Sequence, residues 1–321
     1  MLRMRDRRSD YDITNTVQVC DTDAVCAAVS ELYLDLYPKA DISPLKTGFI
    51  EFGQMFRGEH QEYHGCETTY HDLQHSMDVT LAMARLIHGY ERSPKRKPEL
   101  GPRRAIVGLL TAIFHDIGYI RSIDDQAHKD GAEYTLTHVG RSGDFLELFL
   151  SRVGFTDAAK YASTIVHFTG YEIPLDQIHV DDEGYMMVGH LLGTADMLAQ
   201  MADRCYLEKC RDRLYDEFFK GGVAQQVQED GSINVNYSSP QNLLEKTPNF
   251  VRMTLNNRLG KSFCNAKKYM AAFFGGNSPY LEYIEKSMHH LDNVIYHNSW
   301  DLLRRKPECY NINYYQSGGS N

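Results

Sequence analysis

The sequence predicts an all-α fold on three observations. Residues 70–88 place apolar side chains at the spacing of one helix face. Residues 104–117 are almost continuously apolar, and a segment of that length that stops at Gly118 is typical of a buried helix. Strand-like alternation is weak and confined to residues 232–237, where it indicates a small hairpin or a loop.

The other elements follow in chain order from helical patterns and from the prolines that interrupt them. The first ten or so residues resemble a loose arm, and residues 93–102 are a basic, proline-rich connector. Residues 23–57 mix a helical pattern with breaks at Pro38 and Pro44. Further helices are expected over residues 131–153, 156–168, 185–208, 261–274 and 279–295, before a polar tail from residue 311.

Length and composition limit the organisation of the chain. With 321 residues, 42% of them apolar, the chain can bury a sizeable core in one large domain or two modest ones. We expect an N-terminal helical segment over residues 1–57, a metal-binding core over residues 58–212 and a mainly helical C-terminal extension over residues 213–321 that packs on the core.

The charge and the cysteines indicate the setting of the protein. A formal net charge of -9 argues against a nucleic-acid-binding surface, although an acidic protein can bind a small phosphorylated molecule when metal ions supply positive charge. The sequence has neither an apolar run of about 18 residues, as a membrane span needs, nor a secretory signal. Seven scattered cysteines without a Cys-x-x-Cys pair favour a reducing, cytoplasmic location.

Histidines and aspartates within the predicted helices carry the chemistry. His71 and His75 are four residues apart, which predicts that both project from one helical face, with Asp78 one turn further on. His115 and Asp116 end the apolar helix, where burial of this pair is unfavourable unless something compensates. A metal ion compensates, because neutral imidazole and ionised carboxylate are natural metal ligands.

Asp196 is a further candidate because it lies within an otherwise apolar helix. Gly189, Gly193 and Gln200 fall on the same helical face as this aspartate. Each glycine within a helix costs about 1 kcal/mol relative to alanine, so close packing against another helix or a site is expected there. A weak helix that breaks at Gly193 is the alternative.

Two stretches resemble known phosphohydrolases. Residues 70–79, Tyr-His-Asp-Leu-Gln-His-Ser-Met-Asp-Val, resemble the signature of the class I cyclic nucleotide phosphodiesterases, with Asp72 in place of Asn and Ser76 in place of Ala. Residues 114–118, Phe-His-Asp-Ile-Gly, resemble the His-Asp signature of the wider HD superfamily, whose later aspartate corresponds to Asp196. The resemblance covers about residues 70–206 and implies an HD-type helical bundle.

A second branch of the same superfamily is also similar. Residues 137–146 and the stretch from Asp196 to Tyr206 resemble the HD-GYP cyclic di-GMP phosphodiesterases. Residues 167–174 match that branch only in part, since the second His and the compact Gly-Tyr-Pro are missing. Tyr119 stands where that branch usually has Lys. These departures argue against cyclic di-GMP as the substrate.

The resemblance implies a centre of two divalent metal ions, which can be zinc, magnesium, manganese or iron. Asp116 would bridge the two ions, and His71 would be the general acid that protonates the leaving alkoxide. Asp78 would either hold the second nitrogen of a histidine or be a charge on the helix surface. The implied metal ligands are His75, His115, Asp116, His138, His167 and Asp196.

The expected function is metal-dependent hydrolysis of a phosphodiester, with a cyclic nucleotide as the leading substrate. Three alternatives stay open. Other HD hydrolases act on nucleotides or cyclic dinucleotides, and some HD proteins with four His and two Asp are di-iron oxygenases. The third alternative is a catalytically silent HD module used for binding. We expect the C-terminal extension to supply a wall of the substrate pocket, because the ligands end at Asp196 and a substrate needs more surface.

Overall fold

The computed structural model describes residues 7–94, 96–228 and 230–318, and the predicted N-terminal arm lies largely outside them. Most of the described chain is helical and its two short strands form one hairpin, so the predicted all-α fold is confirmed. No helix in these three ranges is long and apolar enough to cross a membrane.

The predicted helices appear in the predicted order, but those expected over residues 131–153 and 261–274 begin later, at His138 and Lys268. The α-helices are α1 (Thr22–Leu36), α2 (Ser43–Phe56), α3 (Leu73–Glu91), α4 (Gly101–Phe114), α5 (His138–Arg152), α6 (Thr156–Ile165), α7 (Glu183–Ala202), α8 (Tyr206–Lys209), α9 (Tyr215–Lys220), α10 (Pro240–Met253), α11 (Lys268–Phe273), α12 (Pro279–His297) and α13 (Ile312–Gln316). Short 3₁₀ turns are η2 (Ile117–Tyr119), η3 (Gly131–Tyr134), η4 (Val166–Phe168), η5 (Leu175–Gln177) and η8 (Trp300–Leu302), and π-helical turns are η6 (Cys210–Leu214) and η7 (Thr254–Ser262). Strands β1 (Gln225–Val227) and β2 (Ile233–Val235) pair in antiparallel fashion.

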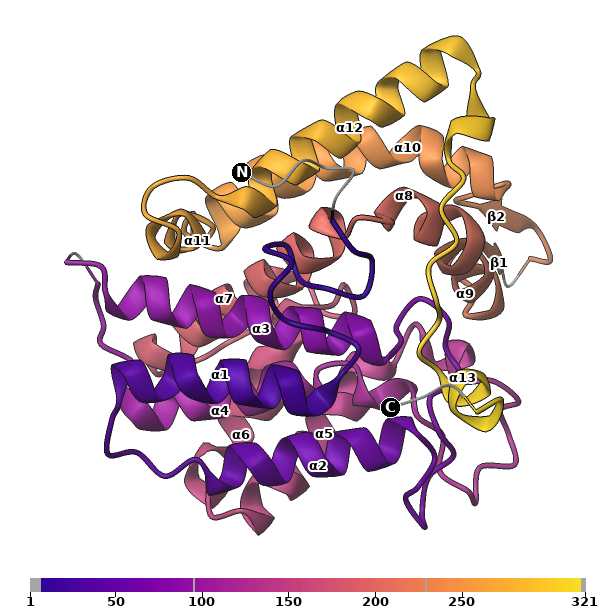
Figure 1. The fold of residues 1–321 in the computed structure, drawn as a ribbon. Coiled ribbons are helices and arrows are strands. Elements are labelled where there is room, and N and C mark those ends of the chain that lie inside the picture. Colours follow the sequence, from indigo (N-terminus) through magenta and orange to yellow (C-terminus); the bar gives the residue numbers. More distant parts are fainter. Residues whose placement is uncertain (1–6, 95, 229, 319–321) are drawn as a thin grey trace.

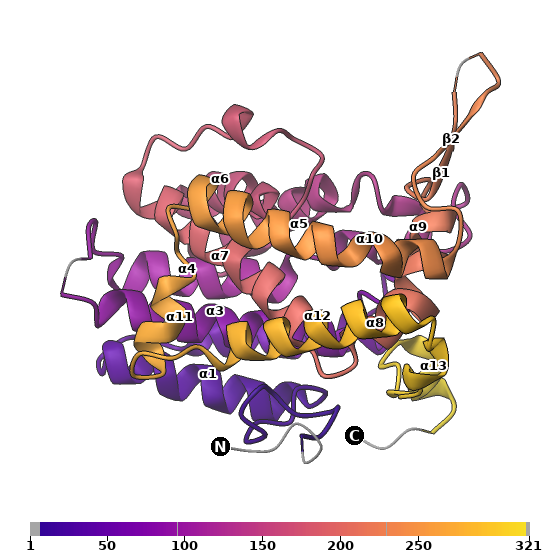
Figure 2. The ribbon, with the colours of Figure 1, turned by 90° about the horizontal axis from the view of Figure 1, so that it is seen from above.

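Helices α3 and α7 form the centre of the molecule. Figure 1 shows α1, α2 and α4 on one side of this pair and α10, α11 and α12 on the other. Seen from above in Figure 2, α10 and α12 run over the central helices, and the β1–β2 hairpin projects beyond α9. Residues of the C-terminal extension therefore lie against the helices that carry the predicted ligands.

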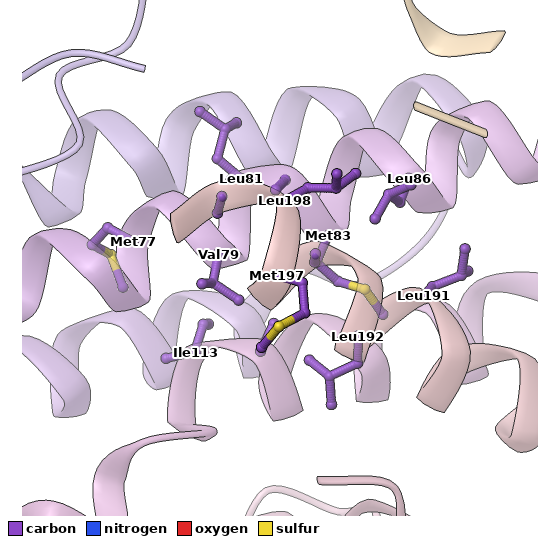
Figure 3. Packing of buried hydrophobic residues seen from close by; sticks show 14 of the residues in the cluster. Met77, Val79, Leu81, Met83, Leu86, Ile113, Leu191, Leu192, Met197 and Leu198 are labelled. Atoms are coloured by element: carbon purple, nitrogen blue, oxygen red, sulfur yellow. The ribbon is translucent and has the colours of Figure 1, made fainter. Parts of the chain in front are cut away.

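The core between the central helices is tightly packed. Met77 and Val79 of α3 are fully buried, as is Leu198 of α7 (Figure 3). A Cβ added at Gly193 would lie 2.5 Å from the carbonyl oxygen of Phe168, and one at Gly189 would lie 2.6 Å from the ring of the same residue. Close packing is therefore the reason for these glycines, and α7 continues unbroken through them.

Helix α10 is an element that the sequence does not predict. Two prolines hide its helical pattern. Pro240 lies in the first turn, where its missing N–H needs no partner, whereas Pro248 lies inside the helix. The buried face of α10, which includes Leu243 and Val251, holds the helix in place despite this interruption.

Candidate metal centre and active site

Four of the predicted ligands meet where α3, α4 and α7 converge. His75 lies in the first turns of α3, His115 and Asp116 follow the last residue of α4, and Asp196 lies in α7. The Oδ2 atom of Asp116 is 3.2 Å from Nε2 of His75 and 3.1 Å from Nε2 of His115. Oδ1 of Asp196 is 3.5 Å from Nε2 of His75. The two histidines and Asp116 are buried, with one ligand atom of each within 4.8 Å of the others.

The hydrogen bonds within this cluster fit a metal ion. Nδ1 of His115 donates to the carbonyl oxygen of Ala112 at 2.9 Å, so Nε2 of the neutral ring carries its lone pair toward the cluster. Nε2 of His115 and Oδ2 of Asp116 are both buried without a hydrogen-bond partner. Two acceptors that face each other in the interior need a cation or a shared proton. A divalent cation is therefore a natural occupant of the cluster.

The pKa of His115 also indicates that the cluster favours a positive charge. Burial acts to lower the pKa of His115, but the carboxylates of Asp116 and Asp196 outweigh it and raise this pKa to about 9. The bare cluster therefore holds a proton at neutral pH. Because a metal needs the deprotonated imidazole, a bound divalent ion would take the place of that proton.

His138 lies beside this cluster in the first turn of α5. Its Nε2 atom is 3.6 Å from Oδ1 of Asp116, on the side of that carboxylate away from His115. Nδ1 of His138 donates to the carbonyl oxygen of Thr135 at 2.9 Å, the same arrangement as at His115. Burial lowers the pKa of His138 to about 4, so the ring is neutral and can act as a ligand.

His167 is not brought into this group. It lies in the turn η4, is half-buried, and is not among the residues that line the cavity at the cluster. Burial lowers the pKa of His167. The nearby charged groups are Asp144 of α5, which acts to raise this pKa, and Lys160 of α6, which acts to lower it. The second metal ion, which would need both His138 and His167, thus stays a prediction that the described geometry does not support.

His71 reaches the site in a different way from the one predicted. Helix α3 begins at Leu73 with Asp72 as its N-cap, so His71 precedes the helix and does not share a helical face with His75. The prediction of one shared face was wrong because the capping side chain of Asp72, which accepts from the backbone N–H of His75 at 3.1 Å, starts the helix later.

Glu217 of α9 holds His71 in place. Its Oε2 atom is 2.6 Å from Nδ1 of His71, and its Oε1 atom accepts the backbone N–H of Thr69 at 2.6 Å and that of Tyr70. The Glu217 side chain is only 2% exposed. Burial acts to lower the pKa of His71, but the charge of Glu217 outweighs it, so this pKa lies above its ordinary value.

Sequence reasoning missed Glu217, and of the two alternatives for Asp78 the surface charge is wrong. Glu217 is 146 residues away from His71 along the chain, and no motif or spacing connects the two. Asp78 is buried rather than a surface charge. Burial and the nearby carboxylate of Asp203 raise its pKa to about 8, so it is largely a neutral acid at neutral pH.

We expect Glu217→Gln to lower kcat at neutral pH by roughly 10- to 100-fold while the metal content stays unchanged. An amide cannot stabilise the imidazolium, so the pKa of His71 falls and the alkaline limb of the pH–rate profile moves to lower pH. Asp216→Asn is the matched control, because it removes an exposed carboxylate from the same helix. A profile that does not move would contradict this role of Glu217.

Tyr119 fixes the rings on either side of the cluster. Its ring stacks on His71 at 4.6 Å and on His138 at 4.1 Å, centroid to centroid. Tyr119 stands at the position that usually carries Lys in the HD-GYP branch, and here its aromatic ring packs against both histidines. This stacking restricts their rotation and keeps each ring at the edge of the cluster.

A family model described as Npun_R2479-like matches residues 53–272, which is more than half of the chain. The chain belongs to the Npun_R2479-like family. No curated protein and no solved structure matches it. The matched segment of the Npun_R2479-like chain contains the whole His–Asp cluster, His71 and Glu217.

The cluster opens into a cavity of about 510 Å³ in this Npun_R2479-like protein. His71, His75 and Asp116 line it. Another part of the lining, called here the wall, comes from residues between 206 and 250. From Leu214 onward these residues belong to the C-terminal extension, which contributes to the lining as predicted. The members of that wall are Tyr206, Cys210, Leu214, Phe218, Val223, Tyr237, Leu243, Lys246, Thr247 and Phe250.

Proposed function

We propose that this protein is a metal-dependent phosphohydrolase that cleaves a phosphodiester in the cavity at the His–Asp cluster. One observation carries the proposal: buried, unpartnered ligand atoms of His115 and Asp116 lie next to His71, a histidine whose ring is held by a buried carboxylate. His75 and Asp196 complete the proposed ligand set for one ion. His138 is a candidate for a further ligand.

The residues of the chain have separate tasks in the proposed reaction. A bound divalent ion would lower the pKa of water and offset the charge on the phosphoryl oxygens. Water would supply the new oxygen on phosphorus and release a proton to the solvent, and the bond from phosphorus to the leaving oxygen would break. His71 gives its Nε2 proton to that oxygen, while Glu217 stabilises the imidazolium until the transfer. Tyr70 donates to Gln200 at 3.1 Å and closes the site beside His75.

The resemblance of residues 70–79 to the cyclic nucleotide phosphodiesterases, and of residues 114–118 to the HD superfamily, supports this proposal. Cyclic nucleotides are therefore the first substrates to test. Other nucleotides and cyclic dinucleotides are the alternatives within the same reaction class.

Metal analysis of the purified protein combined with a panel assay tests the proposal. We expect at least one divalent ion per chain, and activity that a chelator abolishes and that added manganese, magnesium or zinc restores. The panel holds cyclic AMP, cyclic GMP, cyclic di-GMP, nucleoside mono- and triphosphates and bis(4-nitrophenyl) phosphate. Two irons without hydrolysis of any ester would instead support an oxygenase, and a protein that binds no metal would overturn the proposal.

A further inference from the structure

The wall of the cavity formed by residues 206–250 is mainly apolar, whereas Glu172 lines another part of the cavity. Among the described residues of that wall none is acidic, and Lys246 is the only basic one. Leu214, Leu243 and Phe250 present hydrocarbon surface to the cavity, together with the remaining aromatic and aliphatic side chains of that wall. A ligand that fills this part of the cavity gains from burial of apolar surface rather than from charge pairing.

Three polar side chains of the cavity make hydrogen bonds within the chain. Nζ of Lys246 donates to the carbonyl oxygen of Asn236 at 2.6 Å, and the hydroxyl of Thr247 donates to the carbonyl oxygen of Leu243 at 2.9 Å. Gln200 is the only amide side chain among the described residues of the lining. It accepts from the hydroxyl of Tyr70, and its Nε2 atom lies 3.4 Å from Oδ1 of Asp196. A nucleobase would thus find no uncommitted amide to read its edge.

Three large, mainly apolar side chains lie where the cavity meets solvent, together with the exposed Lys246. Leu136 is 52% exposed, Tyr171 is 64% exposed and Phe250 is 36% exposed, and all three line the cavity. Large apolar side chains at a cavity entrance favour a ligand that carries apolar surface itself. They come from three different parts of the chain, before α5, after η4 and in α10.

We propose that the substrate is an amphiphilic phosphodiester, which places its phosphate at the His–Asp cluster and an uncharged alkyl or aryl group along the wall of residues 206–250. This inference rests on the proposed phosphohydrolase function and makes it specific. The cleavage is the same hydrolysis, in which water supplies the new oxygen on phosphorus and His71 protonates the leaving oxygen. A nucleoside is the less favoured occupant, because the one amide on the described lining, Gln200, is already engaged by Tyr70.

The first experiment measures binding without turnover. Methyl-, butyl- and octylphosphonate are titrated into the manganese-loaded protein by calorimetry. Each methylene that becomes buried contributes roughly fourfold in affinity, so we expect at least about a 100-fold gain from methyl to octyl even with incomplete burial. The second experiment measures kcat/KM for the methyl, butyl and octyl 4-nitrophenyl phosphodiesters, in which the leaving group is constant, beside cyclic AMP.

A pair of exposed residues on one helix provides the variant and its control. Phe250→Ser removes an apolar group that lines the cavity, whereas Met253→Ser removes one that is 53% exposed on the same helix and does not line it. We expect the octyl-to-methyl ratio to fall severalfold in Phe250→Ser and to stay unchanged in Met253→Ser. Both positions are exposed enough for the variants to fold.

The outcomes separate the two proposals. Metal-dependent hydrolysis whose rate and phosphonate affinity do not depend on chain length would overturn the apolar-substrate inference and leave the phosphohydrolase proposal standing. A much higher kcat/KM for cyclic AMP than for the octyl ester would also overturn the apolar-substrate inference and leave the phosphohydrolase proposal standing. If no ester is hydrolysed with any metal, the phosphohydrolase proposal fails, and the substrate inference fails with it.

Discussion

Asp116→Asn is expected to remove both the metal ion and the activity. The Oδ2 atom of this carboxylate is 3.2 Å or less from the ring nitrogens of His75 and His115, and its Oδ1 atom faces His138 at 3.6 Å. The amide keeps the shape but loses the charge that attracts the ion and one of the two acceptor oxygens. Since a metal contributes several kcal/mol to phosphoryl transfer, we expect a loss of at least about 10³-fold in kcat, with the metal content close to zero.

Elemental analysis and the rate of ester hydrolysis, measured on the same preparation, check this result. Asp144→Asn is the matched control, because that aspartate is exposed on α5 and does not line the cavity. Circular dichroism establishes that both variants are folded. Metal at the wild-type level in Asp116→Asn would mean that the ion is held elsewhere, and the cluster would lose its proposed role.

His71→Ala is expected to give the opposite pattern, with the metal retained and most of the activity lost. His71 lies outside the His75, His115 and Asp116 triad, and its Nδ1 atom is occupied by Glu217. Loss of a general acid lowers a rate by about 10²–10⁴-fold when the leaving group is a poor one. With a 4-nitrophenyl ester the loss should be much smaller, because 4-nitrophenolate leaves without protonation.

Two esters that differ only in the leaving group, an alkoxide and 4-nitrophenolate, therefore test the role of His71 directly. The exposed His179 provides the control variant His179→Ala. Equal losses on the two esters would show that His71 does not protonate the leaving oxygen. Loss of metal from His71→Ala would instead make it a ligand.

The sequence predicted most of the helices and four neighbouring candidate ligands because these depend on local patterns. His75, His115 and Asp196 lie in or directly after helices whose apolar faces are readable from their spacing, and packing of those helices brings the side chains together. Such patterns cannot reveal Glu217, since only the tertiary fold brings α9 to the segment before α3. His167 was predicted as a ligand from a short motif but does not join the cluster. The match of such a motif does not determine which way the turn η4 directs the side chain.

The contact between Glu217 and the segment of residues 69–71 has a consequence for how the protein is made. Three of the proposed ligands, His75, His115 and Asp116, have been synthesised by residue 116, but Asp196 comes about eighty residues later and Glu217 follows it after about another twenty. The full set of proposed ligands and the carboxylate that orients His71 would therefore emerge from the ribosome close together. Under the proposed function, a nascent chain would gain its metal ion and its aligned proton donor at nearly the same stage of synthesis.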